Sequence, residues 1–209
     1  MVNINAFFSR LIPHVMGCPE PLAEQAVRDA AIEFCSLTQA VIETLDPITV
    51  PAGFDSIELD LPTGTVIDQV LQVWFNEQAL QAVPIGQVTG IYLPDGNPKE
   101  YAGVDIDETF NLRLFPAPDR LVRNGLVVRV ALRPSRTATQ VHDILYQRYA
   151  DAIVHAAAAR LMAIPDQPFT NEQKAVMFER AARSKANIAR ADALQGRVKS
   201  SLSVQMRAF

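Results

Sequence analysis

The chain has 209 residues, of which 49% are hydrophobic and 20% charged. This composition is typical of a globular protein and excludes an intrinsically disordered chain. The net charge of −4 is mild and predicts no general affinity for nucleic acid or an anionic membrane. The charge is unevenly spread: residues 136–209 hold 11 Lys and Arg against 6 Asp and Glu, whereas residues 1–135 hold 8 against 17.

The first part of the chain has helical periodicity. A short amphipathic segment, residues 4–12, ends at Pro13. A longer helix is predicted from about Pro21 to Gln39, because Pro21 suits a first helical turn, where its missing N–H costs nothing. Apolar residues then recur at spacings of three and four, which predicts one buried face. They are Leu22, Ala26, Val27, Ala30, Phe34 and Leu37.

From Pro47 the period changes to that of β-strands. Ile57, Leu59 and Leu61 alternate with acidic residues, residues 66–75 are rich in β-branched and aromatic side chains, and Asn76-Glu77-Gln78 turns the chain back. Two further alternating segments occupy residues 109–115 and 126–133, with prolines and glycines between them. This pattern predicts a small antiparallel sandwich or barrel.

The helical period returns after Pro134. One predicted helix stops near Pro165 and contains the run Ala156–Ala159, which would let another helix approach closely. Thr170, with Gln173 three residues later, is predicted to cap a last helix that reaches about Gly196, with one apolar side formed by Val176, Ala182, Ala186 and Ala189. The fold class is therefore α+β: a discontinuous helical bundle (1–46 and 136–197), an inserted β domain (47–135) and an extended C-terminal arm (198–209).

The sequence contains no motif that points to catalytic, cofactor-binding or metal-binding residues. The glycines form no phosphate-binding loop, and no nucleophile elbow or HExxH motif is present. His142 and His155 are 13 residues apart and cannot share a metal if both lie on one helix, and His14 has no neighbouring ligand in the sequence. Acidic clusters such as Glu58/Asp60 and Asp105/Asp107/Glu108 are interpreted as solvated strand faces rather than cation sites. An enzyme with an unrecognised site remains a third hypothesis, with no residue to nominate.

The last predicted helix is basic, and three interpretations stay open. Its cations could form a solvated face, contact an acidic protein surface or contact phosphate. Because Phe178 is its only aromatic residue, base stacking is not supported. A nucleic-acid-binding module that uses this helix is the alternative function. The cations, including two beyond the helix, are Lys174, Arg180, Arg183, Lys185, Arg190, Arg197 and Lys199.

The final segment, residues 198–209, alternates like a strand but has no hairpin partner. Leu202, Val204, Met206 and Ala208 fall on every second residue, which fits either a fraying tail or a strand added to a partner's sheet edge. In the second case, Arg197 and Lys199 would steer docking onto an acidic partner.

Several segments resemble tailed-bacteriophage head-to-tail adaptor (connector) proteins. The resemblance runs from about Gly17 to Asn171 and fades between Pro84 and Val104. It is carried by Gly17-Cys-Pro-Glu-Pro-Leu, Arg28-Asp-Ala-Ala-Ile-Glu-Phe-Cys, Leu45-Asp-Pro-Ile, Leu59-Asp-Leu-Pro, Leu132-Arg-Pro-Ser-Arg-Thr-Ala-Thr and Tyr149-Ala-Asp-Ala-Ile.

The resemblance implies a structural virion protein and no enzyme. It implies a homo-oligomeric ring, a dodecamer, below the portal protein, which extends the DNA channel and offers a platform for a tail or head-completion protein. Packaged DNA would pass without sequence-specific binding. No cofactor and no membrane would be involved, and the chain would be made in the host cytoplasm and end in the virion neck. The resemblance also implies that the arm contacts the portal, through Arg197, Lys199, Leu202, Val204, Met206, Ala208 and Phe209.

Overall fold

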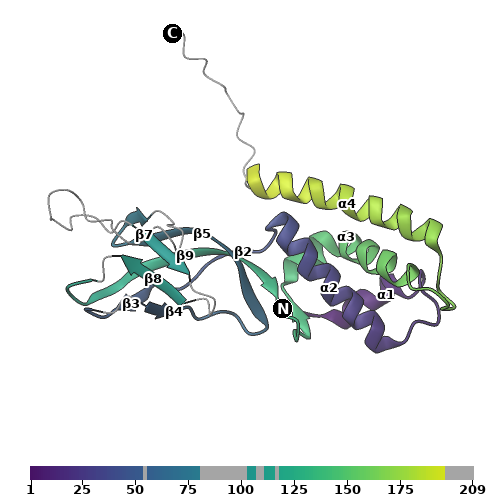
Figure 1. Cartoon of the computed structure of the whole chain (residues 1–209), viewed down its shortest axis with the longest axis horizontal. Coiled ribbons are helices and arrows are strands. Elements are labelled where there is room, and N and C mark those ends of the chain that lie inside the picture. The colour runs from purple at the N-terminus through teal and green to yellow at the C-terminus, as the bar shows by residue number, and fades with distance from the viewer. Residues whose placement is uncertain (54–55, 81–102, 107–110, 116–117, 196–209) are drawn as a thin grey trace, which may run out of the picture. The chain divides into compact units, whose positions relative to one another are not determined.

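The computed structural model describes residues 1–53, 56–80, 103–106, 111–115 and 118–195. They form an α+β chain with antiparallel sheets, as the sequence predicts. The chain falls into two compact units (Figure 1). The helical unit consists of Met1–Ala40 and the chain from His142 onward, and the β unit is Val41–Val141.

The helical unit contains the strand β1 (Val2–Asn3), the 3₁₀ turn η1 (Ile4–Phe7) and the helices α1 (Phe8–Leu11), α2 (Glu20–Thr38), α3 (Asp143–Met162) and α4 (Glu172–Gln195). The predicted helix 21–39 is confirmed as α2, with proline in its first turn. It ends at Gln39, whose φ of 52° breaks the helical path.

The helix α3 is the centre of this unit and packs against α1, α2 and α4. Leu145, Ile153 and Leu161 are fully buried or nearly so, and each such side chain contributes about 1.5–3 kcal/mol by leaving water. Ala157 and Ala158 have no exposed surface. Their small side chains let the neighbouring helices approach closely.

The start of α4 differs from the prediction in one residue. Asn171, not Thr170, is the cap: its Oδ1 accepts a hydrogen bond of 3.0 Å from the backbone N–H of Lys174. The Thr170 hydroxyl instead donates to the Ile164 carbonyl (2.5 Å) and accepts from the Gln167 N–H (3.0 Å). Thr170 therefore closes the loop between α3 and α4, and the next residue caps the helix.

The β unit contains nine described strands; eight of them form two antiparallel sheets, and the ninth is short and belongs to neither. One sheet has the order β2-β9-β5-β6, with β3 also paired to β9, and the other has the order β4-β8-β7. The strands are β2 (Ile42–Thr44), β3 (Ile48–Val50), β4 (Ser56–Glu58), β5 (Thr65–Phe75), β6 (Gln78–Leu80), β7 (Gly103–Ile106), β8 (Asn111–Phe115), β9 (Val122–Pro134) and β10 (Gln140–Val141).

The long strands β5 and β9 hold the larger sheet together. They pair from Thr65↔Pro134 to Phe75↔Leu126, and Leu126, Val128 and Val130 of β9 have no exposed surface. Asn76 and Glu77 both have positive φ, as a two-residue hairpin turn requires, and join β5 to β6. The described strands do not close into a barrel, so that part of the prediction is not met, and the sandwich remains a prediction.

Candidate assembly surfaces of the helical unit

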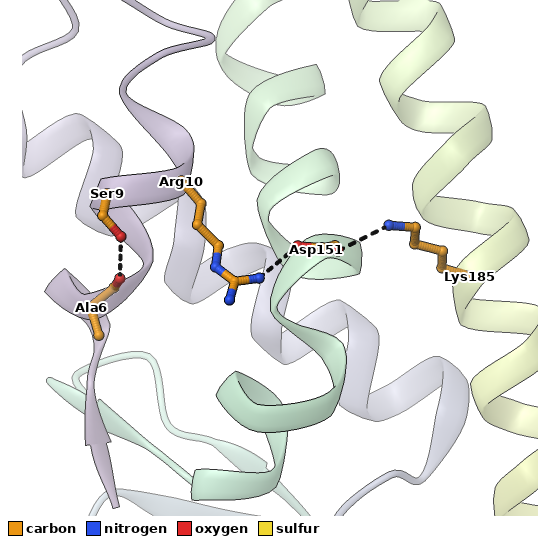
Figure 2. A network of polar contacts seen from close by, with 5 residues as sticks. All are labelled: Ala6, Ser9, Arg10, Asp151 and Lys185. Atoms are coloured by element: carbon orange, nitrogen blue, oxygen red, sulfur yellow. Dashed lines mark hydrogen bonds and ion pairs between the residues drawn. The ribbon is translucent and has the colours of Figure 1, made fainter.

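A network of polar contacts links three helices of the helical unit: α1, α3 and α4. Asp151 of α3 accepts a hydrogen bond of 2.7 Å from Arg10 of α1, and the Lys185 Nζ of α4 lies 3.6 Å from its other oxygen. Figure 2 shows this carboxylate between the two cations. The hydrogen bond from Arg10 is the largest cause of a lowered pKa at Asp151; burial opposes it, and the charges of Lys185 and Arg10 add to the lowering. Because all three side chains are partly exposed, each pair adds at most about 1 kcal/mol.

Two histidines far apart in the sequence meet on one aromatic ring. The ring centroids of His14 and His155 lie 4.9 and 5.0 Å from that of Phe178 in α4. Burial lowers the pKa of His155, and the charge of Lys185 lowers it further, while Asp151 opposes the shift. Its Nδ1 is buried and has no hydrogen-bond partner among the described residues. The surroundings of His155 in the folded chain therefore disfavour its protonated form.

A groove of about 690 Å³ lies between α2, α3 and α4. Half of its lining residues are alanines, which come from all three helices, and its larger apolar side chains are Phe34, Leu37 and Val176. Phe34 is buried, whereas Leu37 and Val176 are not. Both were predicted to lie on buried stripes, and this is wrong: Leu37 is 48% exposed and Val176 is 47% exposed. The two residues line the groove because no other described element covers this side of the helices.

Charged side chains surround the groove. Arg160 of α3 pairs with Glu33 of α2, and Arg183 pairs with Glu179 at 3.0 Å within α4. Glu172 also lines the groove and has no ion pair within the described residues. The Nη1 of Arg160 is buried without an acceptor in the described part of the chain. The groove thus combines an apolar lining, a slight excess of carboxylates and one unsatisfied donor.

The basic residues of α4 do not act as one patch. Arg183 and Lys185 are engaged by Glu179 and Asp151. Lys174, Arg180 and Arg190 are exposed and make no ion pair with another described residue. Two of the five cations are thus partly neutralised by carboxylates, which weakens the phosphate-binding alternative.

No group of three or more His, Cys, Asp or Glu side chains in the described residues could hold a metal ion. His142 caps α3 instead, since its Nδ1 accepts a hydrogen bond of 3.2 Å from the Ile144 N–H. Glu58 and Asp60 are exposed. Asp107 and Glu108 lie outside the described residues. The helices that the structure describes include none long and apolar enough to cross a membrane.

The predicted portal-contact residues of the arm all lie outside the described residues. They are Arg197, Lys199, Leu202, Val204, Met206, Ala208 and Phe209. Sequence reasoning missed the exposed apolar residues Met177 and Ile188 of α4, which are 70% and 61% exposed. Their positions off the alanine stripe of that helix were the available signal.

The features described above are packing surfaces and ion pairs, which are the means of protein assembly. The model of the SU10 adaptor protein family matches residues 10–204. The match spans nearly the whole chain, and the chain belongs to this family, in keeping with the resemblance to phage head-to-tail adaptors. Its role is accordingly that of a structural adaptor of a phage particle. No curated protein matches the chain.

Proposed function

We propose that this adaptor forms a ring below the portal of a tailed phage, extends the DNA channel and provides the attachment platform for the tail. The observation that carries the proposal is the family match over residues 10–204. The ring is a dodecamer in this proposal, and packaged DNA passes through it without sequence-specific contacts. The acidic balance of residues 1–135 supports such passage, since carboxylates along a channel repel phosphates.

The arm, residues 198–209, binds the portal by strand addition. Its alternation of apolar and polar residues supports this mode, in which main-chain hydrogen bonds supply affinity and every second side chain fills a pocket. Arg197 and Lys199 precede the alternating segment and would speed docking onto an acidic surface.

The experiment is co-sedimentation of the full chain, and of a chain ending at Arg197, with portal particles of the same phage. We expect the full chain to sediment with the portal and the truncated chain to stay in the supernatant. A scrambled arm of the same composition is the control for charge alone. Binding that survives truncation would remove the arm from the mechanism, and no binding by the full chain would contradict the portal assignment.

A further inference from the structure

The groove between α2, α3 and α4 exposes apolar side chains that no other described element covers. Ala156 lies in it half-exposed and Ala163 exposed, so an incoming helix could approach the backbone of α3 closely. Leu37 and Val176, which also line it, are 48% and 47% exposed. A partner that carries apolar side chains would remove this apolar surface from water.

The same helix that borders the groove carries a second apolar surface on another side. Met177 and Ile188, with Ala181 and Ser184 between them, form a stripe along α4. None of the four lines the groove. At 3.6 residues per turn, the stripe lies roughly 120° around the helix from Val176 and Arg183 at the groove edge. We call it the α4 stripe.

The α4 stripe and the groove agree in length. Met177 and Ile188 are 11 residues apart, or about 16 Å along a helix that rises 1.5 Å per residue. The lining of the groove on α3 runs from Ala152 to Ala163, which is the same separation.

Their charges are complementary. Lys174 and Arg180 flank the α4 stripe and have no ion-pair partner among the described residues. The groove is lined by three glutamates, Glu33, Glu172 and Glu179, against two arginines. Cations beside the stripe would thus face a groove with spare carboxylate charge.

We infer that the groove of one chain receives the α4 stripe of a second copy of the same chain. The two surfaces are different and point in different directions, so the contact is head-to-tail, and each copy keeps one free groove and one free stripe. Such an interface repeats from copy to copy instead of stopping at a symmetric pair, and it closes into a ring when the rotation between copies divides a full turn. This inference rests on the proposed ring and names the surfaces that build it.

The test uses three full-length chains. One carries Met177→Asp and Ile188→Asp in the stripe, one carries Ala156→Trp in the groove, and the control carries Ile12→Asp, at an apolar residue that is 51% exposed and belongs to neither surface. Ala163→Trp, at an exposed lining residue, replaces Ala156→Trp if that chain does not fold. Each is bound to portal particles and treated with a carbodiimide, which joins only carboxylates and amines already in contact.

The unchanged chain and the control are expected to give a ladder of cross-linked species, and each blocked chain only the monomer. The fall in cross-linked dimer is at least roughly tenfold, because blocking the stripe would bury unpaired carboxylates. An equal mixture of the two blocked chains gives a dimer and nothing larger, since one intact groove meets one intact stripe and growth stops. A ladder that survives in either blocked chain, or a mixture without the dimer, overturns the inference.

Portal binding is read separately, by co-sedimentation of the same samples. Full-length chain that binds the portal but yields no ladder overturns the inference and leaves the portal assignment in place. A ladder in the chain at high concentration without portal binding supports the stripe-and-groove contact while contradicting the portal assignment.

Discussion

Two alanines of the same run in α3 should differ in how strongly their enlargement affects stability. Ala158 has no exposed surface, whereas Ala156 is half-exposed and lines the groove. In Ala158→Leu, the added carbons have no space and must displace neighbouring side chains, at a cost of about 1–3 kcal/mol. In Ala156→Leu, the same atoms enter the groove, and the free energy of unfolding should change by less than about 0.5 kcal/mol.

The two variants are compared by thermal unfolding, followed by circular dichroism at the helix band. For a chain of this size, 1 kcal/mol shifts Tm by roughly 2–4 °C, so Ala158→Leu should lower it by about 2–12 °C. Ala156→Leu should leave Tm almost unchanged. Equal losses in both variants would mean that the groove is closed in solution, and no loss in Ala158→Leu would mean that the helices do not pack tightly at this alanine.

Two further predictions concern the start of α4 and the contact between α3 and α4. Asn171→Ala should lower the free energy of unfolding by about 0.5–2 kcal/mol, because the Lys174 N–H loses its cap; chemical denaturation measures this, and an unchanged midpoint would contradict the assignment of the cap. The pKa of His155 is lowered in the folded chain, so the unfolded chain binds this proton more readily. The free energy of unfolding should therefore be highest above the ordinary pKa of 6.5 and should fall as the pH drops below it. His155→Gln should flatten this dependence while its ionisable neighbours Asp151, Lys185 and His14 stay in place. Denaturation midpoints that keep the original slope between about pH 5 and 7 would exclude His155 as its source.

Local rules explain why several elements could be predicted without a structure. The helix α2 follows from a proline at its start and an apolar period of three to four, and both are properties of nearby residues. The turn between β5 and β6 follows from Asn76, a residue that tolerates positive φ. The resemblance to adaptor proteins rests on short sequence segments, so it can be recognised without knowing which residues contact one another in the fold. The family match confirms that assignment.

What the sequence leaves open depends on partners that are distant along the chain. Periodicity identifies Leu37 and Val176 as members of apolar stripes, but only the packed helices decide whether a neighbour covers them, and here none of the described elements does. Which of Thr170 and Asn171 caps α4 depends on the path of the preceding loop, because the Thr170 hydroxyl is engaged by the Ile164 carbonyl.

The meeting of His14 with His155 on one ring, and of Arg10 and Lys185 on Asp151, likewise has no local signature. The sequence by itself therefore determined the long helices, the long strands and the family, since these follow from neighbouring residues, whereas the short strands β1, β2 and β10 fall in segments that were assigned to the helical bundle. The groove and the α4 stripe were decided by tertiary structure alone, because exposure is a property of the space around a side chain and not of the residue.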